Sequence, residues 1–157
     1  MTEPIQIRKA TLADIPVLAH QRMGMYTDMG MGTPASRERA IEMFVPYLKD
    51  NLVNGVYHGW LAETGDGQVV GGGGLIVHGW PAAARDQKPR SCRAYILNIY
   101  TEPEYRGRRI ARRIMNAIVD WCRAEGFETV SLHASPMGRP LYESMGFEPT
   151  NEMRLNL

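Results

Sequence analysis

The chain has 157 residues, of which 44% are hydrophobic and 22% are charged, and its formal net charge is +1. This composition is ordinary for a globular protein, and a charge so near neutrality argues against broad binding to nucleic acid. No apolar run approaches the ~20 residues that a transmembrane helix needs, so we expect no membrane partner.

Length and cysteine content indicate one domain in a reducing compartment. A chain of this size can bury a real core, so residues 1–157 are expected to form a single domain. Cys92 and Cys122 are too few and too far apart for a disulfide framework or a metal site. The segment Met1–Pro4 lacks the basic-then-apolar pattern of a signal peptide. We therefore expect a cytoplasmic protein with free thiols and no bound metal.

The N-terminal segment predicts a strand followed by a helix. Residues 5–8 alternate between apolar and polar side chains, as a short strand does. Thr11 belongs to a residue type that caps helices, and residues 12–29 show a helical pattern. Pro16 is compatible with this helix because proline fits in a first turn.

A second helix is predicted after the break at Gly30–Pro34. It starts near Ser36, and Gly55 closes it. Apolar residues recur within it at helical spacing, namely Ile41, Phe44, Val45, Leu48 and Leu52. Because Pro46 falls inside this pattern, we expect the helix to be kinked or split there.

The next segment predicts two strands joined by a hairpin. Residues 56–63 alternate as a strand, Thr64–Gly67 is a turn signal, and residues 68–80 continue as the second strand. Gly71–Gly74 is unusual inside a strand because glycine weakens strand pairing. Two interpretations of these glycines remain open: tight packing against a helix, or contact with a ligand.

A strand over residues 91–101 leads into the most informative stretch, Tyr105–Arg113. The helical spacing of the isoleucines from Ile110 to Ile118 indicates that a helix begins there, and Gly126 is suited to end it. The first turn of a helix has unpaired N–H groups and partial positive charge. A glycine lets the backbone approach an anion, and arginines add charge-assisted hydrogen bonds. We therefore expect a phosphate-bearing ligand at residues 106–112.

Two motifs in this half resemble a known family. Arg106–Ala111 resembles the Arg/Gln-x-x-Gly-x-Gly/Ala motif with which acyl-CoA-dependent N-acetyltransferases of the GNAT superfamily wrap the pyrophosphate of coenzyme A. The fourth position is Arg109, where the family usually has glycine, and Gly107 is expected to supply some of the missing room. Leu141–Phe147 is similar to the family's Leu-Tyr-x-x-x-Gly-Phe. The resemblance is strong over residues 92–157. In the residues that precede position 92, it rests only on the pattern of predicted strands and helices.

The resemblance implies an α/β protein of the α+β type with the GNAT fold. We expect a mixed sheet of about six to seven strands, antiparallel at first, flanked by about four helices. A strand over residues 129–134 should lie beside the strand over 91–101 and splay from it, so that acyl-CoA fits between them. A short helix would follow, and Phe147 would lead into a last strand.

The activity implied is transfer of an acetyl group from acetyl-CoA to a primary amine by direct attack in a ternary complex. Tyr142 would be the general acid for the leaving thiolate, since a phenol is protonated at neutral pH. A backbone N–H near Ile99 would stabilise the oxyanion. The coenzyme-binding residues implied are Ile99, Tyr100, Thr101, Arg106, Gly107, Arg108, Arg109, Ile110, Ala111, Arg112 and Ser135, the last standing where many relatives have asparagine.

The sequence does not identify the general base that would deprotonate the amine. No carboxylate occurs in residues 94–98. Glu63, His78 and His133 are the candidates, and His133 has a neutral form near physiological pH.

The resemblance places the acceptor against the region between the first two helices, residues 23–32. Its methionines and glycines suggest an adaptable apolar wall, although Met23 and Met25 are interpreted as core residues. Asp28 would hold a cationic amine, and Tyr26 and Trp80 would shape the cleft. Nothing in this segment selects an amino acid, a polyamine, an aminoglycoside or a protein amine.

Two other classes of function remain open. One is a module of the same fold that senses acyl-CoA without turnover. Arginine instead of glycine at position 109 and the lack of an identified base favour this function, whereas the presence of Tyr142 opposes it. The other is a nucleic-acid binder that uses the Arg106–Arg113 cluster, which lacks interleaved aromatic residues. Arg112, Arg113 and Arg123 also fit a solvated helix face. Homodimers are common in the family, and no segment here demonstrates one.

Overall fold

The computed structural model describes residues 4–157 and has a five-stranded sheet at its centre. Met1–Glu3, part of the segment examined for a signal peptide, lie outside the described residues. The strands lie in the order in which they occur in the chain, and are β1 (Ile5–Lys9), β2 (Tyr57–Thr64), β3 (Val69–Gly79), β4 (Cys92–Thr101) and β5 (Ser131–Leu132). The first four are antiparallel neighbours and β5 is parallel to β4, which confirms the mixed sheet.

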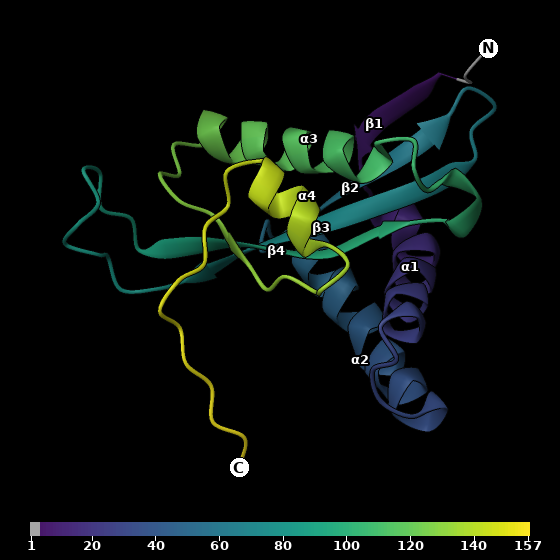
Figure 1. The fold of residues 1–157 in the computed structure, drawn as a ribbon, viewed down its shortest axis with the longest axis horizontal. Coiled ribbons are helices and arrows are strands. Elements are labelled where there is room, and N and C mark those ends of the chain that lie inside the picture. Colours follow the sequence, from purple (N-terminus) through teal and green to yellow (C-terminus); the bar gives the residue numbers. More distant parts are fainter. Residues whose placement is uncertain (1–3) are drawn as a thin grey trace.

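Helices cover both faces of this sheet, as Figure 1 shows, with α3 on one side and α1 and α2 on the other. The helices are α1 (Ile15–Asp28), α2 (Pro34–Val53), α3 (Ile110–Ala124) and α4 (Arg139–Ser144). Two 3-10 turns occur at Leu12–Asp14 and Pro103–Tyr105. Within residues 4–157, none of the helices is long and apolar enough to cross a bilayer.

The helix starts follow local chemistry. Thr11 caps the 3-10 turn before α1, and its backbone N–H donates to Asp14 Oδ2 at 2.7 Å. Pro16 lies in the first turn of α1, as predicted. Thr33 caps α2 by accepting a hydrogen bond from the Ser36 N–H, so this helix begins at Pro34, two residues earlier than predicted.

The predicted split of the second helix at Pro46 is wrong, because α2 continues through this residue to Val53. Proline has no backbone N–H, so the carbonyl of Glu42, four residues before Pro46, receives no hydrogen bond from this position of the helix. Pro46 and Glu42 both lie on the exposed side of the helix, where water can satisfy that carbonyl. Phe44 and Leu48, on the buried side, keep the helix packed against the sheet.

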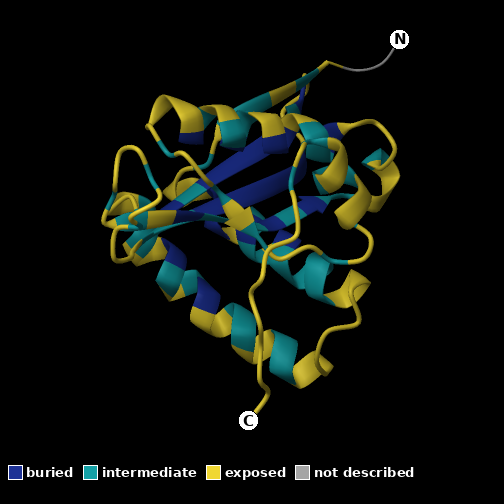
Figure 2. Cartoon of the chain, turned by 60° about the vertical axis from the view of Figure 1, so that its left-hand side comes forward, coloured by how far each residue is buried: buried dark blue, intermediate teal, exposed yellow. Residues whose placement is uncertain are grey.

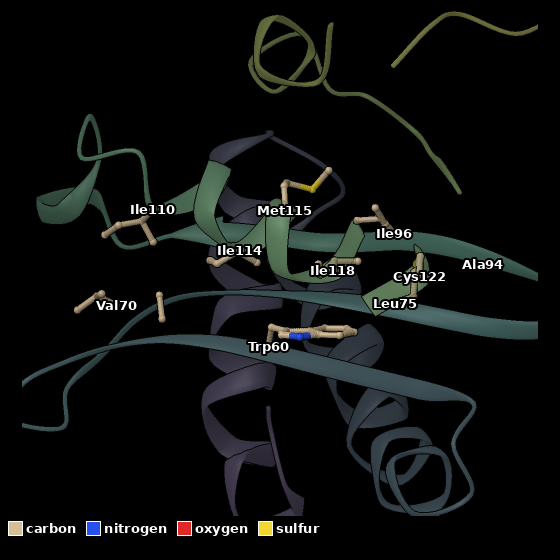
Figure 3. Close-up of a cluster of buried hydrophobic side chains, with 11 residues drawn as sticks. Trp60, Val70, Leu75, Ala94, Ile96, Ile110, Ile114, Met115, Ile118 and Cys122 are labelled. Carbon is tan, nitrogen blue, oxygen red and sulfur yellow. The ribbon is translucent and has the colours of Figure 1, made fainter. Parts of the chain in front are cut away.

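Two apolar cores hold the layers together, and the buried residues of the strands run between them (Figure 2). On one face, Ile110, Ile114 and Ile118 of α3 pack against the sheet, as Figure 3 shows. On the other face, Leu18 of α1 and residues of α2 pack against Tyr57 and Leu61. Trp60 belongs to the first core and Leu61 to the second, because successive residues of a strand point to opposite faces.

The glycines of β3 are explained by tight packing, which decides between their two interpretations. A methyl group on Gly73 would lie 2.5 Å from Ile99 Cδ1 and 2.8 Å from Ile114 Cγ2. On the other face, a methyl group on Gly72 would clash with Gln21, and one on Gly74 with Tyr57. The strand therefore needs glycine so that helices and aromatic rings can approach its backbone.

Two expectations about the C-terminal part are wrong. The strand predicted over residues 129–134 is reduced to Ser131–Leu132, and residues 145–157 form no strand, so the described sheet has five strands rather than six to seven. Pro149 has no backbone donor, and its neighbours over residues 148–152 are mostly polar and exposed. This segment lacks the alternating apolar side chains that fix a strand on a sheet.

Candidate active site

A cavity of about 950 Å³ opens along the second half of β4. Its walls are the C-terminal half of α1, the turn before α3, the segment after β5, and α4. The coenzyme-binding residues expected from the sequence line it together, with the exception of Arg108: Ile99, Tyr100, Thr101, Arg106, Gly107, Arg109, Ile110, Ala111, Arg112 and Ser135. Tyr142 lines the same cavity.

A β-bulge interrupts β4 beside the cavity. Gly72 pairs with Tyr100 and Gly74 with Leu97, so the single residue between those glycines faces two residues of β4, Asn98 and Ile99. Asn98 has φ 58°, a left-handed conformation that asparagine tolerates better than most residues. The strand that precedes the glycine- and arginine-containing turn is therefore bulged at Asn98 and Ile99.

The bulge changes which side chains of β4 face which helices. Leu97 packs in the core beneath α1 and α2, and the next residue, Asn98, points to the same side, where its Nδ2 donates to Tyr57 Oη at 3.3 Å. Ile99 packs in the core beneath α3. Tyr100 returns to the first side, where its ring lies against Gly24 of α1. A regular strand would have placed Asn98 under α3.

The edge of β4 next to the cavity is only partly paired. β5 pairs with β4 only at Tyr95 and Ile96, so the residues of β4 from Leu97 to Thr101 have no strand partner on that side in the described chain. The pairing of β4 with β5 therefore ends at Ile96, as it does where two strands splay apart. Backbone N–H and C=O groups that face a cavity can bind an extended ligand as a neighbouring strand would.

The turn before α3 is built from two residues with positive φ. Gly107 has φ 77°, and Arg109, the N-cap of α3, has φ 61° and ψ 19°. A left-handed backbone at this position explains why the family motif usually has glycine there. The departure at Arg109 therefore puts strain into the backbone and also adds a side chain beside the expected phosphate.

The arginines of this turn point in different directions. Arg106 donates from Nε to the Thr101 carbonyl oxygen at 3.0 Å and from Nη2 to Asp28 Oδ2 at 2.5 Å. Arg112 donates to Ser144 Oγ at 2.6 Å, which joins α3 to α4. Arg108 is outside the cavity lining: it donates to the Glu104 carbonyl oxygen at 3.3 Å, and its guanidinium lies over the Tyr105 ring.

Tyr142 projects from α4 and is partly buried. Its ring packs edge-on against Phe147, and Gly138 leaves room for it, since a methyl group there would lie 2.9 Å from the ring. Burial raises the pKa of the Tyr142 phenol, so the hydroxyl stays protonated at neutral pH. Ser135 accepts a hydrogen bond from the Gly138 N–H at 3.1 Å and so shapes the turn that leads into α4.

Only one of the three candidate bases lines the cavity. Glu63 is ion-paired with Arg8 at 2.6 Å, and His78 packs against Trp80, both outside the lining. His133 lines the cavity, where its Nδ1 contacts the Tyr95 hydroxyl and its Nε2 lies 2.9 Å from Glu152 Oε1.

The end of α1 and the loop after it form an apolar wall, as the sequence suggested. Met25, Met29 and Met31 line the cavity with Tyr26, whereas Met23 and Trp80 do not. The interpretation of Met25 as a core residue is therefore incomplete. Asp28 also lines the cavity, but it is already paired with Arg106, which weakens its expected role as a partner for a cationic amine.

Among the polar residues of the lining, Arg22, Tyr95 and Asn98 lie outside the two motifs identified in the sequence. A signal for Arg22 existed: it continues the helical spacing of Leu18, Met25 and Met29, and so places a charge on an apolar face. Tyr95 and Asn98 carried no such signal, since both lie in an apolar strand. Within residues 4–157 no three histidine, cysteine or acidic side chains gather into a group that could hold a metal ion.

Comparisons with known proteins agree with this geometry. The family model described as "Acetyltransferase (GNAT) family" matches residues 26–147. The chain is 29% identical over 96 residues to N-acetyltransferase 8B from Rattus norvegicus. That match covers 59% of this chain and 40% of the rat protein, so the chain matches well under half the length of this curated relative.

Two solved structures match nearly the whole chain. A GCN5-related N-acetyltransferase from Ralstonia eutropha JMP134 is 30% identical with a TM-score of 0.90, and the match covers 98% of this chain and 99% of that one. A predicted acetyltransferase from Clostridium acetobutylicum, crystallised with acetyl-CoA, is 27% identical with a TM-score of 0.85, over 98% and 96% of the two chains.

Proposed function

The chain belongs to the acetyltransferase (GNAT) family, and we propose that it transfers an acetyl group from acetyl-CoA to a primary amine by direct attack in a ternary complex. One observation carries this proposal. Three features line a single cavity: the edge of the bulged strand β4 that has no strand partner within residues 4–157, the glycine- and arginine-containing turn of α3, and the Tyr142 side chain.

The residues present fit coenzyme A. The turn supplies Arg106, Gly107 and Arg109 beside the first N–H groups of α3, which have no partner within the helix. These groups and Arg112 would hold the pyrophosphate. The backbone of Ile99–Thr101 would bind the pantetheine arm, with Ser135 across the gap from it. When bound, acetyl-CoA supplies the acetyl thioester.

Residues of the chain would then act on the reacting groups. A backbone N–H near Ile99 would donate to the carbonyl oxygen of the thioester and stabilise negative charge there. Tyr142 would donate its proton to the departing sulfur, a role open to it because burial raises the pKa of its phenol and keeps the hydroxyl protonated at neutral pH. His133 is the candidate base that lines the cavity, and to receive a proton from the amine it would exchange its contact with Tyr95 or Glu152 for the amine.

The first test is binding of acetyl-CoA by isothermal titration calorimetry. We expect binding in the micromolar range, and loss of it in the double variant Arg106→Glu plus Arg109→Glu, because two charge reversals oppose the phosphates. The matched control is Lys49→Glu plus Arg85→Glu, two exposed residues outside the cavity, which should bind as wild type does. A folded wild-type protein that does not bind acetyl-CoA would reject the proposal.

The second test separates turnover from binding. Tyr142→Phe should lower kcat by about 100-fold, the scale of a general acid, while the Kd for acetyl-CoA changes little. Tyr105→Phe is the matched control: Tyr105 lines the cavity but donates to Gln68 Oε1 at 3.1 Å, away from the proposed chemistry. Unchanged turnover in Tyr142→Phe would exclude the acid role, and binding without turnover of any amine would favour the sensor function instead.

A further inference from the structure

Arg22 is a cation held in a fixed position on the wall of the cavity. Its Nη1 donates to Asn98 Oδ1 at 2.5 Å, and its guanidinium lies 4.9 Å from the Tyr26 ring centroid and 4.6 Å from that of Phe44. Asn98 in turn donates to the buried Tyr57 hydroxyl. The side chain is therefore oriented by one hydrogen bond and two aromatic faces.

Arg22 takes part in no ion pair within the described part of the chain. No carboxylate lies within 4.0 Å of Arg22 in residues 4–157, and its Nε is buried without a hydrogen-bond acceptor. A guanidinium offers five donors, and the described chain engages one of them. Removing such a group from water costs free energy unless an anion or further acceptors compensate. The arrangement therefore favours an anionic ligand at this place.

The charges of the cavity lining also favour an anionic ligand. Among the residues that the structure describes, four arginines line the cavity against one carboxylate, Asp28, which is already paired with Arg106. Three of the arginines belong to the turn and first helical residues that would hold the pyrophosphate, which leaves Arg22 apart from them on α1. A polyamine or an aminoglycoside would meet no free carboxylate here, so the lining opposes a polycationic acceptor.

We propose that the acceptor is an α-amino carboxylate with an apolar side chain, and that Arg22 binds its carboxylate. This inference rests on the proposed function. Arg22 is anchored to Asn98, the neighbour of Ile99, so a carboxylate held there places an adjacent amine beside the edge of β4. Met25 and Tyr26 follow Arg22 on the same helix, Met29 is the residue that caps its end, and the three offer an apolar surface to the side chain.

The test compares matched pairs of amines: L-methionine with L-methioninamide, and L-leucine with L-leucinamide. We expect kcat/KM at least 10-fold higher for the amino acid in each pair, the scale of a charge-assisted hydrogen bond. The amine of an amide is the less basic of the two, so chemistry alone favours the amide. A preference for the amino acid therefore reports recognition of the carboxylate. Spermidine and kanamycin should be poorer acceptors still.

Variants assign this preference to Arg22. Arg22→Met should bring the amino acid to amide ratio to about 1, and Arg22→Lys should keep part of it, because lysine retains the charge but not the planar fork. Arg139→Met is the control, since Arg139 lies on α4, pairs with Glu143 and does not line the cavity. Should the Arg22 variants not fold, the amine pairs in the wild type decide the matter alone.

A binding measurement separates failure of this inference from failure of the proposed function. In the presence of coenzyme A, calorimetry should show N-acetyl-L-methionine binding at least 10-fold more tightly than N-acetyl-L-methioninamide. If acetyl-CoA binds and amines are acetylated but the amides are preferred, the function stands and the carboxylate inference is overturned. If acetyl-CoA does not bind, the proposed function itself has failed. Equal binding of the two products would also overturn the inference.

Discussion

Asp28 at the end of α1 and Arg106 in the turn before α3 form an ion pair across the cavity, with 2.5 Å between Oδ2 and Nη2. The same guanidinium donates from Nε to the Thr101 carbonyl oxygen of β4. One side chain thus joins a helix, a strand and the turn proposed to hold pyrophosphate. The pair also means that part of the positive charge offered to a phosphate is neutralised by a carboxylate of the protein.

Replacing Asp28 by asparagine should therefore tighten binding of coenzyme A. The change removes a negative charge from the phosphate site but leaves a side chain that can still accept from Arg106. Partly exposed pairs are worth up to about 1 kcal/mol, so we expect Kd to fall by about 2- to 5-fold in calorimetry. The gain should shrink as salt is raised. Asp50→Asn, exposed on α2, should leave Kd unchanged, and weaker binding by Asp28→Asn would contradict the prediction.

The left-handed backbone at Arg109 predicts an unusual order of stability. Arg109→Gly and Arg109→Ala both remove the guanidinium, but only glycine adopts φ 61° without strain. The glycine variant should be more stable than the alanine variant by about 1 kcal/mol in urea unfolding. At Arg113, within α3, the order should reverse, with alanine more stable by about 1 kcal/mol. The same order at both positions would show that φ at Arg109 is not the cause.

Tight packing of β3 predicts that a single methyl group is costly at Gly73. An alanine there meets Ile99 and Ile114 at distances that ordinary Cβ atoms do not show, so the core must shift. We expect Gly73→Ala to lower the free energy of unfolding by about 2 kcal/mol. Gly65→Ala is the matched control, since its methyl group would meet only Pro4 Cγ at 3.5 Å, an ordinary contact. Equal effects of the two substitutions in thermal or urea unfolding would refute the packing account.

The interactions of Asp14 with Arg8 and Thr11 predict how the free energy of unfolding depends on pH. Hydrogen bonds from Arg8, at 2.9 Å to each carboxylate oxygen, lower the pKa of Asp14 below its usual 3.8, and the Thr11 N–H adds to this. Because the folded pKa is the lower one, the stabilisation is complete above pH 3.8 and is lost as pH falls through the folded pKa. Asp14→Asn should cost about 2 kcal/mol at pH 7 and less in acid.

The check on this prediction is a series of urea unfolding curves between pH 2 and pH 7. The wild type and Asp14→Asn should approach each other in stability as pH falls, since the wild-type carboxylate becomes protonated. Asp120→Asn, which removes an exposed Asp–Arg pair on α3, should change stability by less than about 1 kcal/mol at every pH. A constant gap between wild type and Asp14→Asn would assign the cost to lost packing rather than to charge.

Local chemistry was sufficient to predict the elements around the phosphate turn. The isoleucines of α3 repeat at helical spacing and form the buried face of that helix, and Gly126, with φ 79°, follows its end as predicted. The hairpin at Thr64–Gly67 also follows from its own residues. In each case the information lies within a few residues of the feature.

Features that depend on distant contacts could not be predicted in the same way. Pro46 was expected to kink or split a helix, but the helix is not split, and the exposed position of Pro46 is set by packing of α2 on the sheet. The left-handed Asn98 is stabilised by Tyr57 and Arg22, residues 41 and 76 positions away in the chain. β5 pairs with β4 over two residues only, and no pattern within residues 129–134 reveals that this strand is so short. The cavity is built from such contacts, so its acceptor side was the least predictable part.

The unpaired edge of β4 has a consequence for the behaviour of the protein in solution. A row of unpaired backbone donors and acceptors on an apolar strand is also a template for a strand of another chain. Natural edges are usually shielded by charge, proline or bulges, and β4 has a bulge at Asn98 and Ile99, close to the point where its pairing with β5 ends. A ligand that binds along this edge and a strand of another chain would therefore use the same backbone groups. A ligand bound there should also reduce aggregation of the folded protein.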